Sequence, residues 1–117
     1  MKGEQHLTRP EQYEQVYKQG RSWVNALLVM KTVPNNLGFS RYGLSVSRRV
    51  GKAVVRNKTK RRLRELLQVA PLKPGWDIVF IARPAIANAK FGAVSEAVAS
   101  LLCRARLLVE GSVACKQ

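Results

Sequence analysis

Residues 41–66 constrain the fold of this chain most, because they combine a strand, a tight turn and a helix with an extreme charge. Alternating residues predict a strand from Tyr42 to Arg48, and Gly51 predicts a tight turn after it. A 3.6-residue apolar repeat then predicts a helix from about Ala53 to Ala70. The first 24 residues of this stretch hold ten of the chain's 21 basic residues and no acidic residue. The fold must therefore pack one face of the helix on a core and keep a dense positive charge outside.

The predicted helix has one apolar sector about 120° wide, enough to pack on a core: Val55, Thr59, Leu63, Leu66, Leu67 and Ala70. The neighbouring sector is basic and carries Arg56, Asn57, Lys60, Arg61 and Arg64, with Lys58 and Arg62 on the far side. Like charges four residues apart destabilise a helix by a few tenths of a kcal/mol per pair, and cations in the first turn oppose the helix dipole. A bound polyanion would reverse this effect. Arginine, which outnumbers lysine here, suits phosphate oxygens, so we favour a nucleic-acid surface over an ordinary solvated basic face.

The whole chain is strongly basic, with a formal net charge of +14 and a pI near 10.8 over 117 residues. This length and a hydrophobic content of 46% predict a single domain over residues 1–117, with an ordered core at about residues 7–110. The charge predicts a polyanionic partner, a nucleic acid rather than a membrane. No apolar run approaches the ~18 residues of a membrane span, and the N-terminal residues lack a secretory segment. We therefore expect a cytoplasmic protein.

The sequence offers no constellation for catalysis or metal binding. His6 is the only histidine and lies near the N-terminus. Cys103 and Cys115 are too few for a disulfide framework and are expected to be reduced thiols. No Cys/His cluster has zinc spacing, and no pair among the seven scattered acidic residues is typical of a two-metal nuclease. We expect a nucleic-acid binder without hydrolytic chemistry of its own.

A first helix is predicted from Thr8 to Gln19. Thr8 and Glu11 fit a capping box, Pro10 falls in the tolerant first turn, and Gly20 marks the end.

The apolar stripe of this first helix is thin and aromatic, because it consists of Tyr13, Val16 and Tyr17. The two tyrosines lie four residues apart and therefore share a face. Two interpretations remain open for them. They are half-buried packing residues, or their rings face a groove in which an unstacked base could lie.

Extended chain is predicted on both sides of a turn-rich loop at Pro34–Ser40. The segment Ser22–Val33 has apolar residues on both parities, which indicates cover on both faces over part of its length, and it could divide into two strands at Asn25. The segment Arg41–Arg48 is expected to pair with it as a hairpin. Lys31 is a lone cation in the first segment, and a lysine at a sheet edge is often only a solvated charge.

One face of the second extended segment is small and polar, because it consists of Gly43, Ser45 and Ser47. A core would not select these residues. We therefore expect this face to be approached by a partner, with plain solvent exposure as the alternative.

A strand is predicted from Trp76 to Ala82, and its continuous apolar run from Ile78 to Ala82 suits a central buried strand, which ends at Arg83-Pro84. A last amphipathic helix is predicted from Phe91 to Val109, with Gly111 after it. The order helix, two or three strands, helix, strand, helix predicts an α+β fold, a two-layer sandwich with a small mixed sheet. A strand–helix–strand crossover is right-handed by default.

The residues GLSVSRRVGKAVVRNKTKRRLRE resemble the signature of the bacterial ribonuclease P protein subunit. The pairs Arg56-Asn57, Lys60-Arg61 and Arg64-Glu65 match its R-N-x-x-K-R-x-x-R-E pattern. The remaining chain resembles the family more weakly, and the resemblance as a whole covers roughly Leu7 to Leu108. It implies a ribosomal-protein-like domain with a left-handed βαβ crossover at the basic helix, and a cleft lined by aromatic residues of the first helix.

This resemblance implies an endoribonuclease holoenzyme in which a large RNA hydrolyses precursor tRNA and releases the 5′ leader, while the protein alone is inactive. Its expected partners are the catalytic RNA and precursor tRNA, without membrane or DNA. Mg²⁺ is expected at the RNA interface, with no dedicated protein site. The expected RNA-binding residues are Arg48, Arg49, Lys52, Arg56, Asn57, Lys60, Arg61 and Arg64. The expected leader groove consists of Tyr13, Tyr17, Lys31, Ser45 and Ser47.

Two other functions compete with this one. A general RNA-binding or ribosomal protein would explain the charge, but not the strict spacing of the basic motif. A nuclease acting by itself is disfavoured by the missing histidine and carboxylate sites.

Overall fold

The computed structural model describes residues 6–7 and 9–108. In chain order its elements are α1 (Pro10–Gln19), β1 (Arg21–Val24), β2 (Leu28–Pro34), β3 (Arg41–Ser45), α2 (Ala53–Val69), β4 (Trp76–Ala82), the 3₁₀ helix η2 (Pro84–Asn88) and α3 (Phe91–Arg104). The predicted α+β class and order of elements are confirmed, and η2 is an additional element. No helix in these described ranges is long and apolar enough to cross a membrane.

The four strands form one mixed sheet in the order β1-β2-β4-β3. The predicted division of the first extended segment at Asn25 is confirmed, because the Asn25 side chain accepts hydrogen bonds from the amides of Leu27 and Leu28 at 3.0 and 2.9 Å. The predicted hairpin between β2 and β3 is wrong. β4 lies between them, antiparallel to β2 and parallel to β3.

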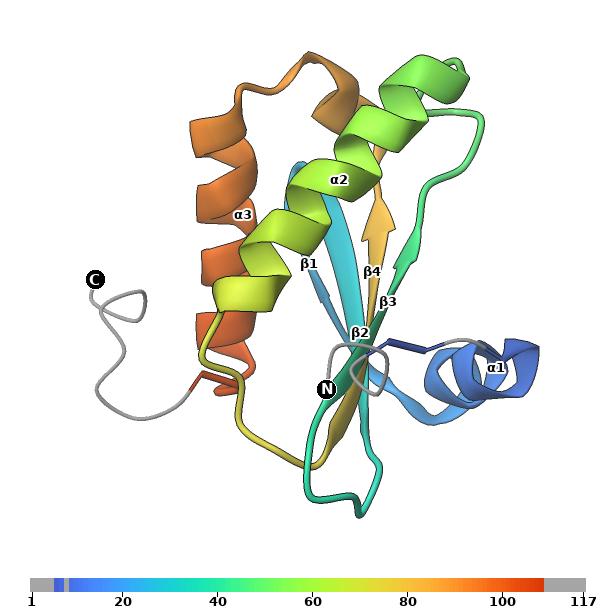
Figure 1. Ribbon diagram of the computed structural model, residues 1–117, viewed down its shortest axis with the longest axis vertical. Helices are drawn as coiled ribbons and strands as arrows, with labels where there is room; N and C mark the ends of the chain where they lie inside the picture. The colour runs from blue at the N-terminus through green and yellow to red at the C-terminus, as the bar shows by residue number, and fades with distance from the viewer. Residues whose placement is uncertain (1–5, 8, 109–117) are drawn as a thin grey trace.

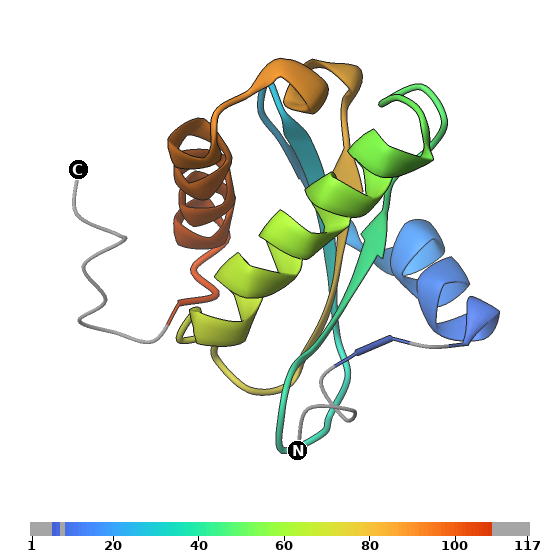
Figure 2. The ribbon, with the colours of Figure 1, turned by 45° about the horizontal axis from the view of Figure 1, so that its top comes forward.

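The connection from β3 through α2 to β4 is a left-handed crossover, as the family resemblance implies. Near their carboxyl ends both strands point upward, β4 lies to the left of β3, and α2 passes in front (Figure 1). The 45° turn in Figure 2 keeps the same arrangement.

The main core lies between the sheet and the layer formed by α2 and α3 (Figure 1). Phe80 in the centre of β4, Leu63 of α2 and Leu101 of α3 are all fully buried in it. α1 covers part of the opposite face, where Val16 packs with Leu7, Val33 and Val79. The sheet therefore packs on the main core with one face and is covered only in part on the other.

α3 ends at Arg104 and not at the predicted Val109, which lies outside the described residues. The backbone reverses at Arg106, whose φ of 58° is in the left-handed region. The amides of Arg106 and Leu107 donate back to the carbonyls of Cys103 and Leu102, the hydrogen-bond pattern of a Schellman motif. This reversal turns Leu107 and Leu108 into the core.

α1 begins at Pro10, two residues later than predicted. Its cap is formed by the amide of Arg9, which donates to Oε1 of Gln12 at 3.1 Å. Thr8, the predicted cap, lies outside the described residues.

Candidate nucleic-acid interface

α2 packs the predicted apolar sector on the core and exposes the predicted basic sector. Thr59, Leu63 and Leu67 are buried, and the Thr59 hydroxyl donates to the Val55 carbonyl at 3.0 Å. Asn57, Arg61 and Arg64 are exposed, while Arg56 and Lys60 are half-buried at the border of the core. The first turn contains no acidic residue and Lys52 stands at the N-cap. No acidic residue in the first turn therefore compensates the positive charge at the start of α2.

The turn before α2 extends this basic surface with three exposed cations, Arg48, Arg49 and Lys52. Gly51 has φ +155°, and a Cβ atom there would lie 3.0 Å from Cβ of Val55. The Arg56 Nε atom donates to the Gly51 carbonyl at 3.2 Å and so ties the helix to the turn. Together with the α2 residues Arg56, Asn57, Lys60, Arg61 and Arg64, these three cations form what we call the basic face.

A hollow of about 260 Å³ lies between the basic face, β3 and α1. It is lined by His6, Leu7, Tyr13, Tyr42, Gly43, Leu44, Lys60 and Arg64. We call it the β3-edge hollow. The structure thus brings Tyr13, predicted for the leader groove, to the same cavity as Lys60 and Arg64, predicted for RNA binding.

The two tyrosines of α1 differ in their surroundings. Tyr13 is half-buried, and its hydroxyl donates to the Leu7 carbonyl at 3.3 Å. Burial raises the pKa of the Tyr13 phenol, against the lowering effects of the Leu44 backbone and of the Arg64 charge. Tyr17 is 41% exposed and belongs to neither core cluster. Tyr13 is therefore also a packing residue, whereas Tyr17 offers a free ring.

The sheet face beyond α1 carries two further residues of the predicted groove. Lys31 pairs with Val79, and Val79 pairs with Gly43, so these three share one face in one row. Ser45 pairs with Ile81 in the next row of that face. Lys31, Ser45 and Ile81 are all half-buried. Ser47 lies past the end of β3, where its Oγ atom accepts from the Arg49 amide at 3.3 Å, so it belongs to the turn.

His6 is a residue of the hollow that sequence reasoning missed, because it lies near the N-terminus and has no catalytic or metal-binding partner nearby in the sequence. Residues 6 and 7 lie along β3, where the Leu7 amide donates to the Tyr42 carbonyl at 2.9 Å. The His6 Nε2 atom lies 2.9 Å from the Tyr42 hydroxyl oxygen, and the two rings meet edge to face at 4.8 Å. No local pattern could indicate a contact across 36 residues.

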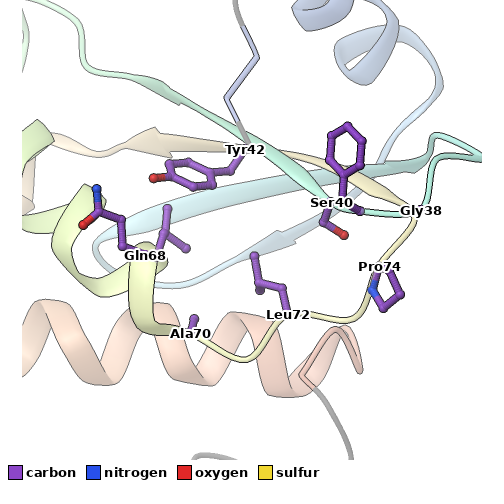
Figure 3. A pocket seen from close by; sticks show the side chains of 9 residues that line it. Gly38, Ser40, Tyr42, Gln68, Ala70, Leu72 and Pro74 are labelled. Atoms are coloured by element: carbon purple, nitrogen blue, oxygen red, sulfur yellow. The ribbon is translucent and has the colours of Figure 1, made fainter. Parts of the chain in front are cut away.

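A second cavity of about 260 Å³ lies beneath the loop before β3, beside the C-terminal end of α2. Figure 3 shows the Tyr42 ring on one side of it and Gln68, Ala70 and Leu72 on the other. Tyr42 also lines the β3-edge hollow, so its ring is a wall between the two spaces. This second cavity contains no basic side chain among its lining residues.

Metal ligands are sparse in this region. Within the described ranges, no three histidine, cysteine or acidic side chains come together in a group that could hold a metal ion. The buried carboxylate of Asp77 is paired with Arg41 through two hydrogen bonds of 2.8 and 2.7 Å. The arrangement is therefore suited to binding an anion through cations, tyrosines and histidine.

Comparison with known proteins points to one family. The sequence model of the family described as Ribonuclease P matches residues 1–106. The chain is 48% identical over 108 residues to the ribonuclease P protein component of Dehalococcoides mccartyi strain CBDB1, covering 92% of this chain and 90% of that relative. It is 43% identical over 116 residues to the ribonuclease P protein component of Roseiflexus castenholzii, covering 97% of this chain and 94% of that relative.

Solved structures of the same kind share the fold. A mutant of the Staphylococcus aureus RNase P protein with defective mRNA degradation activity superposes with a TM-score of 0.87 at 30% identity, over 92% of this chain and 93% of that one. The RNase P protein from Thermotoga maritima gives a TM-score of 0.78 at 32% identity, over 91% and 98%.

Proposed function

Since this chain belongs to the ribonuclease P protein family, we propose that it binds the catalytic RNA of that endoribonuclease and the 5′ leader of precursor tRNA. Membership makes the chain a component of an endoribonuclease holoenzyme that processes tRNA. Three finer statements belong to the proposal. The chain binds a catalytic RNA, it contacts the leader, and it acts in the cytoplasm.

The observation that carries the proposal is the position of the basic face beside the β3-edge hollow. Its exposed residues Arg61 and Arg64 have no acidic partner in the described part of the chain. Cations that are not neutralised release counterions when they bind phosphates, which favours association. The basic face would therefore dock on the phosphates of the catalytic RNA.

The leader would follow the partly covered sheet face from the β3-edge hollow past Tyr17 and Lys31. A single strand binds best where a positive charge tracks its backbone and aromatic rings accept its bases. Tyr17 supplies an exposed ring, Lys31 a half-buried charge and Ser45 a hydroxyl on the same side of the sheet. Such a surface tolerates many leader sequences, because every base has a face that can stack.

The protein would position RNA and leave the hydrolysis to the RNA subunit. We assign the Mg²⁺ of the reaction to the RNA, because Mg²⁺ commonly binds to phosphate oxygens. Neutralising phosphates of the catalytic RNA and the leader would lower the repulsion between them. The protein would therefore reduce the Mg²⁺ concentration that the holoenzyme needs.

A nuclease activity of the chain itself is the second candidate, because the S. aureus relative is described through an mRNA degradation activity. A general RNA-binding protein is the third. Incubating the purified chain with labelled precursor tRNA, with and without a bacterial ribonuclease P RNA, separates all three. We expect leader release at low Mg²⁺ only when both subunits are present. Site-specific cleavage by the RNA-free protein would support the second candidate, and no effect of the protein on RNA cleavage would support the third.

A further inference from the structure

The edge of the sheet at β1 carries three exposed arginines that the proposed function does not use: Arg21, Arg83 and Arg104. Arg21 lies in β1 itself, with its guanidinium carbon 5.4 Å from the centroid of the Trp23 ring. The Arg83 Nη1 atom donates to the Asn25 carbonyl at 2.8 Å, and the Arg104 Nη1 atom donates to the Val24 carbonyl at 3.0 Å. Three elements thus bring one guanidinium each to a single strand. We call these residues the β1-edge arginines.

Two of these guanidinium groups are fixed by backbone carbonyls of consecutive residues. Arg83 and Arg104 therefore bring one positive charge each to the carbonyls of two consecutive residues at the end of β1. A guanidinium has five N–H donors, and the one hydrogen bond made by each group leaves further donors for an outside acceptor. Neither residue forms an ion pair, since the described part of the chain has ion pairs only at Glu14–Lys18 and Arg41–Asp77. The edge is prearranged for an anion.

The β1 edge is a separate surface from the basic face. β1 and β3 are the two outer strands of the sheet, with β2 and β4 between them. At ~4.8 Å between neighbouring strands, the two edges are about 14 Å apart. One phosphate cannot reach both, whereas a folded or extended RNA can. The Cα atoms of Arg21 and Val24, the first and last residues of β1, are ~10 Å apart, a length over which an RNA strand presents more than one phosphate.

We propose that the β1-edge arginines form a second RNA-binding surface, which takes a run of phosphates from an RNA strand. The inference rests on the proposed function in one respect, namely that RNA is the partner. The competing explanation is that charge protects the exposed β1 edge from pairing with another chain. That role predicts self-association after the arginines are removed, without a change in RNA affinity.

The test compares single variants of the full chain that each remove one positive charge: Arg21→Gln, Arg83→Gln, Arg104→Gln and, as a matched control, Lys90→Gln. Lys90 is exposed and lies at the N-cap of α3, outside the β1 edge. Binding to a bacterial ribonuclease P RNA is measured over a series of KCl concentrations. Each arginine variant should lower the slope of log K against log salt by ~0.7–0.9, and weaken binding roughly fivefold near 0.15 M salt. Lys90→Gln should change affinity by less than about twofold.

Arg21→Gln is the decisive variant, because Arg21 makes no side-chain hydrogen bond in the described structure and its loss should leave the fold intact. Arg83→Gln and Arg104→Gln lose a hydrogen bond, so their melting temperatures are measured in parallel. Repeating the titration with precursor tRNA and reconstituted holoenzyme shows whether the phosphates belong to the catalytic RNA or to the substrate. The inference is overturned if the arginine variants behave as Lys90→Gln does with both RNAs.

One further variant separates this inference from the proposed function. Arg64→Gln removes a charge of the basic face and should weaken RNA binding under the proposed function alone. If Arg64→Gln weakens binding while the β1-edge variants match Lys90→Gln, only the second surface is refuted. If the wild-type chain does not bind the RNA at all, the proposed function itself fails.

Discussion

The Tyr13 ring covers Gly43 so closely that a methyl group at position 43 would lie 2.5 Å from the Tyr13 hydroxyl oxygen. Two more ring atoms of Tyr13 would lie 2.6 Å away. The small residue in β3 is therefore what lets α1 approach the sheet. The predicted small face of β3 is approached closely at this position, and the approaching group is an aromatic side chain of the same chain.

We expect Gly43→Ala to displace the Tyr13 ring from the β3-edge hollow. Overpacking of this kind typically costs about 1–3 kcal/mol of folding free energy, and the displaced ring should also weaken leader binding. Urea unfolding and precursor tRNA affinity measure the two effects. Gly38→Ala is the matched control, because a methyl group there would meet no atom within 4 Å. Equal stability and equal precursor tRNA affinity of the two variants would show that the Tyr13 ring can move aside without loss of folding free energy or of leader binding.

Tyr17→Leu should reduce the contribution of the leader to binding and leave the fold unchanged. The ring is 41% exposed, so its removal loses little packing, while stacking on an aromatic ring is worth about 1–3 kcal/mol per base. The measurement is the affinity of the reconstituted holoenzyme for precursor tRNA with a leader and for mature tRNA. Only the affinity for precursor tRNA with a leader should fall. An unchanged difference between the two substrates would place the leader elsewhere.

The stability of the chain should fall at alkaline pH because of two phenols, the half-buried Tyr13 and the buried Tyr42. Burial raises the pKa of Tyr13 and of Tyr42, and the positive charge of Arg64 opposes this rise at both. A raised folded-state pKa stabilises the fold below the unfolded value near 10. This stabilisation is lost as pH rises through the folded value, because the unfolded chain releases the protons first.

The corresponding measurement is the melting temperature between about pH 9 and about pH 11. The melting temperature of the wild type should fall further over this interval than that of a Tyr13→Phe/Tyr42→Phe double variant, which lacks both titrating groups. All other ionisable groups are the same in both proteins, so their effects cancel in the comparison. Parallel melting curves would contradict the assignment of the effect to these phenols.

Removing the charge at Arg41 should destabilise the fold without affecting RNA contacts directly. Asp77 is 5% exposed and accepts hydrogen bonds from Arg41 and from the Asn35 amide at 2.8 Å. Arg41→Gln leaves a buried carboxylate without its counterion. At fully buried sites this lowers the free energy of unfolding by about 3–5 kcal/mol. We expect about half of that loss here, because the Arg41 side chain is partly exposed. Chemical unfolding measures the loss. Arg41→Gln/Asp77→Asn should recover part of it, and a double variant as unstable as the single one would argue against the pairing.

Sequence patterns predicted the elements whose signal is local. The apolar run of β4 identified the central strand, and the periodicity of α2 identified both its buried residues and its basic side. The pairing of β3 was not predictable, because neighbours in the chain were expected to pair and the insertion of β4 between β2 and β3 depends on the whole sheet. The end of α3 was missed because Arg106 takes a left-handed conformation that usually belongs to glycine.

The candidate site was predictable in composition and not in arrangement. The spacing of Arg56 to Arg64 and of Tyr13 to Tyr17 placed each set on a helix face. The meeting of Tyr13 with Lys60 and Arg64 at the β3-edge hollow depends on how α1 and α2 pack against the sheet from opposite faces. His6 joins them only because residues 6 and 7 add to the β3 edge.

The binding of RNA by the basic face is tested most directly by comparing Arg64→Gln with Lys58→Gln. Both residues are exposed on α2, both changes remove one charge, and the two positions lie about 120° apart around the helix. Affinity for a bacterial ribonuclease P RNA is measured against salt concentration. We expect Arg64→Gln to weaken binding and to reduce the slope by ~0.7–0.9, with Lys58→Gln close to wild type. Equal slopes for Arg64→Gln, Lys58→Gln and the wild type would remove the basic face from the RNA interface.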